Sequence, residues 1–354
     1  MAGTRVVGLD IGTTAVRAAQ VEFGSGGPSG KAQPTLSKYA QVALPLGAVR
    51  DGDVADQPAV SHALRQLWQV GKFDTKEVVI GVGSQRIVVR DLDLPWMPLQ
   101  QLKASLPFQV QEMLPMQSGE ALLDYYPTGE YSSDSGRMVS GILVAAPRDT
   151  VAASILAVEG AGLRTTMVDL NAFAVLRAVA RGDLAQRTVA FVDIGARVTN
   201  VVIASQGVPR LVRILRGGGQ DVTDAVATAL SIAIPEAEVI KRQIGIGFQV
   251  SGEYAAAAES VAAVTRNLLE SVRNTLTFYT ANNPGAGVEV IVLTGGGSHL
   301  PGLGQYLSST SRLPATMGDP VVTLKVGKGV PRDSMAGGES LMTLPVGLAF
   351  GVAA

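Results

Sequence analysis

Two short turns in this sequence combine an acidic side chain with a glycine in the same order. Asp10 ends an apolar run and is followed at once by Ile11-Gly12-Thr13-Thr14. A turn of this kind offers backbone N–H groups and hydroxyls to a phosphate, and Gly12 permits close approach because it has no Cβ. A carboxylate beside phosphates requires an intervening cation, and Mg²⁺ with its bound waters is the natural choice. The turn therefore predicts a phosphate and a magnesium ion near Asp10.

The second turn, Asp193-Ile194-Gly195-Ala196-Arg197, begins 183 residues further along the chain. Both turns lie between strand-forming runs, at 6–21 and 189–204, which predicts two similar β-hairpins and hence a duplicated fold. A single Asp-Ile-Gly turn after a strand is more often structural than phosphate-binding. Two copies favour the functional interpretation, in which facing turns hold a triphosphate and both Asp10 and Asp193 serve the metal, through water.

A third glycine turn follows the apolar run 290–294, where Gly295, Gly296 and Gly297 precede Ser298. Three glycines let the backbone lie flat against a ring or a ribose, and the N-terminus of the following helix favours an anion. The alternative is an ordinary tight turn between a strand and a helix. The order of the three turns along the chain is the informative feature.

The composition excludes several other kinds of site. The chain has 354 residues with a net charge of −1, which is not the field of a protein that binds nucleic acid or an anionic membrane. It has no cysteine, which excludes disulfides and thiolate sites, and its two histidines leave almost no material for a histidine-built metal site. Its apolar runs are far shorter than the roughly 18–20 residues that span a bilayer, and its beginning lacks a signal-peptide pattern. We therefore expect a cytoplasmic protein without direct membrane insertion.

Strand and helix patterns alternate around the two hairpins, which predicts an α/β architecture. Turn-rich composition predicts loops at 24–34, 130–137 and 325–340. The expected strands lie at 77–91 (two, about Gly81 and Gly83), 121–127 and 137–146, and the expected helices at 59–70, 98–114 (interrupted at Pro107), 148–160, 169–181, 217–232 and 253–281.

In this order the three turns resemble the phosphate 1, phosphate 2 and adenosine motifs of the actin-like ATPase superfamily, which includes sugar kinases, seventy-kilodalton chaperones and FtsA. Within it the chain is most similar to the PilM family of type IV pilus assembly, in the segments 78–127, 161–178 and 344–354. The resemblance covers the whole chain. It implies two halves around a nucleotide cleft, with an FtsA/PilM-type inserted subdomain. The implied domains are a first core (1–77, 151–186 and 341–354), the insert (78–150), a second core (187–216 and 283–340) and its small subdomain (217–282).

The resemblance also implies that ATP with Mg²⁺ is the ligand and that particular residues bind it. Glu238 would bind the ribose hydroxyls and Lys241 would lie beside the base, although a solvated ion pair is an equal alternative for these two residues. The implied ligand-binding set comprises Asp10, Gly12, Thr13, Thr14, Asp193, Gly195, Thr199, Gly217, Gly218, Glu238, Lys241, Gly295, Gly296 and Gly297.

Some residues depart from the family pattern. Ala196 and Arg197 stand where many members have glycines, and Arg197 either pairs with phosphate or points to solvent. Asn171 lies where chaperone relatives place a carboxylate that orients the attacking water. An amide positions water but is no general base, and Asp169 nearby is better interpreted as a helix N-cap. We therefore expect at most weak ATPase activity.

The implied function is an ATP-binding scaffold of a type IV pilus or a related secretion machine. It would bind the N-terminal cytoplasmic peptide of a PilN-like inner-membrane protein along 78–127, and so be peripheral to the membrane. Other pilus assembly proteins and self-association remain open as partners. The alternatives are an FtsA-like polymerising tether, disfavoured because 338–354 contains no Lys or Arg, and a sugar or metabolite kinase, for which no acceptor carboxylate stands out.

Overall fold

The first half of the molecule is built on a six-stranded sheet. The computed structural model describes residues 4–27, 30, 32–134, 136–330 and 337–351. The antiparallel run of β1, β2 and β3 is extended by parallel strands on the other side of β1, in the order β10-β6-β1-β2-β3-β16. The strands are β1 (Thr4–Ile11), β2 (Ala15–Phe23), β3 (Thr35–Ala43), β6 (Glu77–Val82), β10 (Arg164–Leu170) and β16 (Lys325–Val326), with a small hairpin of β4 (Val49–Arg50) and β5 (Asp53–Val54).

The second half repeats this plan in a five-stranded sheet, in the order β13-β12-β11-β14-β15. Its first three strands are antiparallel neighbours, and β14 and β15 extend the sheet in parallel beyond β11, as β6 and β10 do beyond β1. The expected duplication is therefore confirmed. The strands are β11 (Thr188–Ile194), β12 (Val198–Ser205), β13 (Val208–Arg216), β14 (Val290–Thr294) and β15 (Ala315–Met317).

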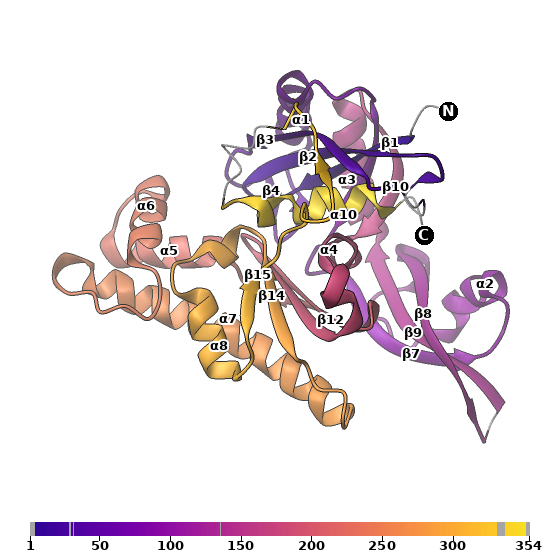
Figure 1. Ribbon diagram of the computed structural model, residues 1–354. Helices are drawn as coiled ribbons and strands as arrows, with labels where there is room; N and C mark the ends of the chain where they lie inside the picture. Colours follow the sequence, from indigo (N-terminus) through magenta and orange to yellow (C-terminus); the bar gives the residue numbers. More distant parts are fainter. Residues whose placement is uncertain (1–3, 28–29, 31, 135, 331–336, 352–354) are drawn as a thin grey trace.

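Helices cover both faces of each sheet (Figure 1). The apolar faces of α4 and α10 fill the space between the sheets, where Val175 and Val346 are fully buried beside Val21 and Phe191. A second core forms between the first sheet, α1 and α3, and a third between the second sheet and α5, α6 and α7. The helices are α1 (Gln57–Gly71), α3 (Arg148–Gly160), α4 (Asn171–Val179), α5 (Gly219–Leu230), α6 (Ile234–Ile244), α7 (Ala255–Asn282), α8 (Leu303–Ser311) and α10 (Thr343–Ala349), with short 3-10 turns at η3 (Gly182–Gln186), η4 (Gly252–Tyr254) and η6 (Glu339–Met342).

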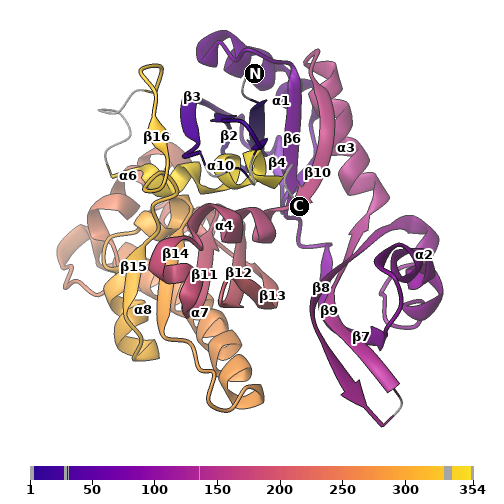
Figure 2. The same ribbon diagram turned by 45° about the vertical axis from the view of Figure 1, so that its right-hand side comes forward.

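A separate three-stranded sheet, in the order β7-β9-β8, projects from the first half beside β13 (Figure 2). It has its own small core around Leu102, Leu106 and Tyr125. The insert was expected to begin at residue 78, but that boundary is too early because β6 is a central strand of the six-stranded sheet. The subdomain comprises β7 (Val88–Pro95), α2 (Leu99–Gln109), η2 (Ser118–Glu120), β8 (Ala121–Ser133) and β9 (Gly136–Pro147).

The structure corrects four local expectations. Pro107 lies inside α2, which ends two residues later. Much of the expected loop 130–137 is strand, because β8 and β9 form one long hairpin. Helix α4 begins at Asn171, since Asp169 still pairs in β10, and Asp169 is an ion-pair partner of Arg177, not an N-cap. The expected loops 24–34 and 325–340 lie partly outside the described residues, and the second contains β16.

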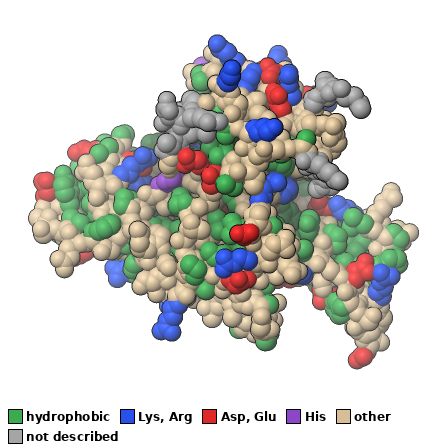
Figure 3. All heavy atoms as spheres, in the orientation of Figure 1, with side chains coloured by type: hydrophobic (Ala, Val, Ile, Leu, Met, Phe, Trp, Pro, Cys, Tyr) green, Lys and Arg blue, Asp and Glu red, His purple; other side chains and the backbone are tan. Residues whose placement is uncertain are grey.

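The distribution of charged side chains on the surface is consistent with the near-equal numbers of basic and acidic residues in the sequence. Basic and acidic side chains are interspersed on the face shown in Figure 3. None of the described helices is both long enough and apolar enough to cross a lipid bilayer.

Candidate functional site

The two acid-bearing turns have the same local geometry. Asp10 lies at the end of β1, where Gly12 N–H donates to Ala15 O at 3.1 Å. Asp193 lies at the end of β11, where Gly195 N–H donates to Val198 O at 3.0 Å. A Cβ built on Gly195 would approach Val198 O to 2.7 Å, and one on Gly12 would approach Ala15 O to 3.0 Å. The glycines are therefore needed for turns this tight.

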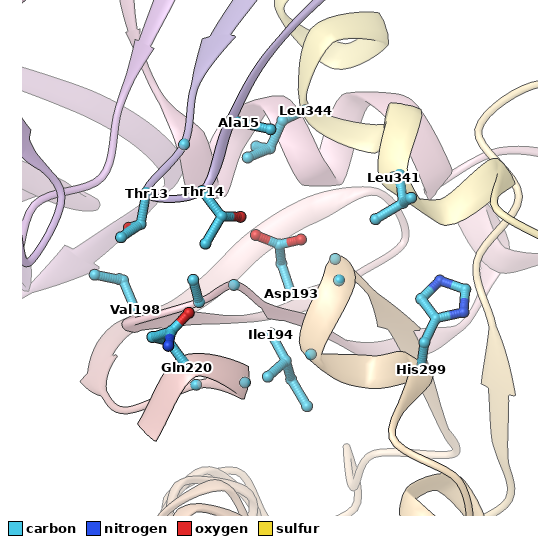
Figure 4. Close-up of a pocket in the computed structure, with 18 of the residues that line it drawn as sticks. Thr13, Thr14, Ala15, Asp193, Ile194, Val198, Gln220, His299, Leu341 and Leu344 are labelled. Atoms are coloured by element: carbon cyan, nitrogen blue, oxygen red, sulfur yellow. The ribbon is translucent and has the colours of Figure 1, made fainter. Parts of the chain in front are cut away.

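Both turns line a single cavity of about 960 Å³ between the two halves. Thr13 and Thr14 approach it from the first half and Asp193 and Val198 from the second (Figure 4). The cavity is large enough for a small-molecule ligand. Tertiary folding thus brings together the two motifs that the sequence places 183 residues apart.

The two carboxylates are buried with little compensation. Asp10 is 6% exposed and accepts one hydrogen bond from Arg17 Nη1 at 3.3 Å. Asp193 is 4% exposed, and its oxygens accept from Thr294 Oγ1 at 3.0 Å and Asn200 Nδ2 at 3.4 Å. Burial raises the pKa of Asp10, and burial together with the charge of Asp10 raises the pKa of Asp193 to about 6. The pair would therefore gain from a cation in the cavity.

The donor set fits a magnesium ion that shares its coordination with phosphate. Among the described residues, no three acidic or histidine side chains are grouped as a complete metal site. Mg²⁺ commonly takes only one or two carboxylates, with the remaining positions filled by waters and phosphate oxygens. Two further oxygens, Asn171 Oδ1 and Asn200 Oδ1, are buried without a hydrogen-bond partner on residues that line the cavity. The residues present fit a hydrated cation beside a polyphosphate.

Helix α6 contributes a buried ion pair to the cavity wall. Lys241 is 8% exposed, and its Nζ donates to Gly219 O at 3.1 Å and Thr223 Oγ1 at 2.9 Å and pairs with Glu238 Oε2 at 2.6 Å. Arg242 pairs with the other oxygen of Glu238 at 2.8 Å. The alternative of a solvated pair is therefore excluded for Lys241, and both Glu238 and Lys241 line the cavity.

The third glycine turn packs directly on the turn that follows Asp193. A Cβ on Gly297 would approach Ile194 Cγ2 to 2.5 Å, and one on Gly295, whose φ is +80°, would approach Ile194 O to 2.5 Å. All three glycines line the cavity. The helix expected to open at Ser298 is only a 3-10 turn, η5 (Gly296–His299), and α8 begins later at Leu303.

Three residues singled out from the sequence are not among the residues that line the cavity. Thr199 and Gly217 lie behind the described lining, where Thr199 Oγ1 donates to Gly217 O at 2.9 Å and so holds the glycine turn that presents Gly218. Arg197, for which a phosphate contact or a solvent-facing position was expected, is partly exposed and is not among the residues that line the cavity. Its guanidinium pairs with Asp221 at 2.6 Å and also with Asp224.

No sequence pattern indicated that the segment 340–344 contributes to the cavity wall. Ser340, Leu341 and Leu344 also line the cavity, and His299 Nε2 lies 2.7 Å from Ser340 Oγ. Figure 4 shows Leu344 beside Ala15 and Leu341 on the side of His299. Burial lowers the pKa of His299. Forty-one residues separate these two positions, so no local pattern indicates their contact.

The two sheets have matching strand orders, and in each of them the equivalent strand, β1 or β11, leads into an acid-bearing turn at one shared cavity. This arrangement defines an actin-like fold. The sequence profile of the family described as Type IV pilus assembly protein PilM matches residues 8–352, and the chain belongs to this family.

The chain is also similar to solved structures and to a curated relative. The PilM-PilN type IV pilus biogenesis complex contains a chain 26% identical to this one, with a TM-score of 0.84 and 98% of each chain covered. MreB 5 of Spiroplasma citri bound to AMPPNP shares the fold, at 14% identity and a TM-score of 0.52 over 97% of this chain and 94% of that one. The cell division protein FtsA of Bacillus subtilis is 21% identical over 68% of this chain, which matches 58% of the length of that relative.

Proposed function

We propose that this protein is an ATP-binding scaffold in the inner-membrane assembly complex of a type IV pilus. The observation that carries the proposal is the shared cavity, in which the turns of Asp10 and Asp193 meet the glycine turn at Gly295. The family membership and the similarity to the PilM-PilN complex support the pilus role.

The partner in this proposal is the N-terminal cytoplasmic peptide of a PilN-like membrane protein. The peptide docks on the three-stranded subdomain and the adjoining part of the first half, within 78–127. This region exposes several large apolar side chains, among them Trp96, Leu99 and Phe108. The scaffold is then held at the inner face of the cell membrane through its partner.

Ligand binding in this proposal uses groups from both halves. The N–H groups of the Gly12 and Gly195 turns, together with the hydroxyls of Thr13 and Thr14, hold the phosphates. Asp10 and Asp193 orient the waters of Mg²⁺, which supplies the positive charge that neutralises the phosphates. Glu238 and Lys241 contact the ribose and the base, and Gly295, Gly296 and Gly297 let the adenosine lie against the backbone.

Turnover in this proposal is slow because the cavity offers little general-base chemistry. The carboxylates among its described lining residues are Asp10, Asp193 and Glu238, of which the first two serve the metal and the third pairs with Lys241 and Arg242. Asn171 positions a water without accepting its proton, and Asp169 is occupied by Arg177. Nucleotide therefore acts mainly by binding.

Calorimetric titration with Mg²⁺–ATP tests the proposal. Asp10→Ala is expected to weaken binding by on the order of tenfold or more, because it removes a group that orients the metal and its waters. Asp183→Ala is the matched control, since Asp183 is exposed in η3 and outside the described cavity lining. Equal affinity of the Asp10→Ala variant and the wild type would refute the assigned role.

A further inference from the structure

One side-chain hydrogen bond crosses from the first half of the molecule to the second phosphate turn. Gln85 Nε2 donates to the backbone carbonyl of Arg197 at 3.1 Å. The same carbonyl accepts from Gly217 N–H at 3.0 Å. Gln85 therefore contacts the point at which the second phosphate turn (193–197) and the glycine turn at 217–219 are joined.

The acceptor belongs to a rigid unit. Gly219 N–H donates to Gly195 O at 2.9 Å and Gln220 N–H to Ala196 O at 2.8 Å, which ties the start of α5 to the phosphate turn. The Arg197 side chain is fixed by Asp221 and Asp224 on the same helix. A shift of the phosphate turn therefore moves Arg197 O and α5 together.

The donor residue, Gln85, lies in the turn through which the chain enters the three-stranded subdomain. The turn 83–87 joins β6 of the six-stranded sheet to β7, the first strand of the three-stranded sheet. It is anchored to the first half, because Gln85 N–H donates to Asp51 O at 3.2 Å and Arg86 pairs with Asp149 at 2.9 Å. Strand β7 begins three residues after Gln85, so a displacement of this turn reorients the subdomain.

A second set of contacts joins the subdomain to the β12–β13 hairpin of the second half. Strand β13 packs against β7, β8 and β9, and Arg210 Nη1 donates to Thr128 O at 3.2 Å. Burial raises the pKa of Asp91 on β7, and the charge of Arg213 on β13 opposes this shift. Arg197 and Gly217 flank the open end of the β12–β13 hairpin, where Val198 pairs with Arg216, and Arg210 lies toward its closed end. The subdomain therefore contacts a hairpin whose open end carries the acceptor of the Gln85 bond.

We propose that Gln85 is a positioning residue that couples the second phosphate turn to the orientation of the three-stranded subdomain. This inference rests on the proposed function, because nucleotide is the ligand that moves the turn. When the halves close on the phosphates, Gln85 transmits the closure to β7 through its bond to Arg197 O. The subdomain that docks the peptide partner is then held in one orientation against β13.

Hydrogen exchange with and without saturating Mg²⁺–ATP tests the coupling. In the wild type, nucleotide is expected to slow amide exchange in β7 by about threefold or more. Gln85→Glu has the same shape and no donor for a carbonyl, so it is expected to lose this protection. Loss of this single hydrogen bond is expected to weaken nucleotide binding by no more than about fivefold. Gln85→Lys restores a donor and is expected to recover the protection in part.

A control variant and two contrary outcomes distinguish failure of the coupling through Gln85 from failure of the nucleotide site itself. Gln66→Glu, on the exposed face of α1, is expected to behave as the wild type. If Gln85→Glu keeps the nucleotide-dependent protection of β7, or if wild-type β7 does not respond while calorimetry shows binding, the coupling is overturned and the nucleotide site stands. If the wild type gives no binding heat with Mg²⁺–ATP, both proposals fail.

Discussion

Asp10 and Asp193 lie at the carboxyl ends of equivalent strands, β1 and β11, and their carboxylates line one cavity. Each is buried, and Asp10 alone has a cationic partner, Arg17. The ligand-free protein therefore holds two acidic groups in an environment that disfavours their charge. In the proposed function, this loss of stability is offset when a cation and its phosphates bind between the two carboxylates.

Asp193→Asn is expected to stabilise the ligand-free protein at pH 7.5 by on the order of 1–3 kcal/mol. Burial raises the pKa of Asp193 to about 6 in the folded state, above the ordinary value of 3.8. The folded protein thus binds the proton more tightly, so the stability contributed by Asp193 falls as pH rises from about 4 to 6. Asn200 Oδ1, which has no partner, can accept from the new amide after a flip.

Urea unfolding of the ligand-free proteins at pH 4.5 and pH 7.5 checks this sign. The free energy of unfolding of the Asp193→Asn variant should exceed that of the wild type by more at pH 7.5 than at pH 4.5. Asp183→Asn should show no such dependence on pH. A gain that is independent of pH would contradict the assigned titration.

Gly297→Ala is expected to lower the free energy of unfolding by about 1–3 kcal/mol and to weaken nucleotide binding. The added methyl would meet Ile194 Cγ2 at 2.5 Å and Gly195 O at 2.9 Å, which displaces the second phosphate turn. Gly296→Ala is the matched control, since its nearest described neighbour would be Leu341 Cδ2 at 3.6 Å. Thermal unfolding that ranks the two variants equally would disprove the packing argument.

Lys241→Met is expected to cost about 1.5–3 kcal/mol of stability and to weaken Mg²⁺–ATP binding. The change leaves Gly219 O, Thr223 Oγ1 and Glu238 without their buried cationic partner. Arg242→Met removes a side chain that also pairs with Glu238 but is 75% exposed, so it should change both quantities much less. Calorimetry and urea unfolding of the two variants provide the comparison, and equal losses would argue against a role for the buried ammonium.

Phe108→Asp is expected to weaken capture of the partner peptide by on the order of tenfold or more, without changing Mg²⁺–ATP affinity. Phe108 is 83% exposed on α2 of the three-stranded subdomain, in the region assigned to docking. Val70→Asp is the control, because Val70 is a 67% exposed apolar residue on α1. Fluorescence polarisation with a labelled cytoplasmic tail of the PilN-like protein gives the affinities, and undiminished capture by Phe108→Asp would move the docking site elsewhere.

Steady-state ATP hydrolysis by the protein alone is expected to lie well below the roughly 1–100 s⁻¹ of kinases. The reason is the amide of Asn171 at a position where a carboxylate would be needed to act as a base. A coupled phosphate-release assay measures the rate. Turnover in the kinase range would require a base that the described cavity lining does not supply.

Local chemistry made much of the site predictable. The two Asp-Ile-Gly turns and the triple glycine at 295–297 follow from residue type and spacing, since turn geometry is fixed within four or five residues. The same holds for the long helix, predicted at 253–281 and found at Ala255–Asn282, whose apolar stripe has helical spacing. Boundaries were less predictable where a strand and a helix abut, as at Leu170 and Asn171.

Residue types and local patterns were enough to establish the duplicated hairpins, their acid-bearing turns and the order in which the chain presents them. Three features became visible in the folded chain alone: Asp10 and Asp193 share a cavity, Arg197 is paired with Asp221, and β6 belongs to the central sheet and not to the insert. The physical reason is the range of the interactions. Turn and helix patterns are set by neighbours along the chain, whereas the cavity and its ion pairs arise where packing of two sheets brings distant residues together.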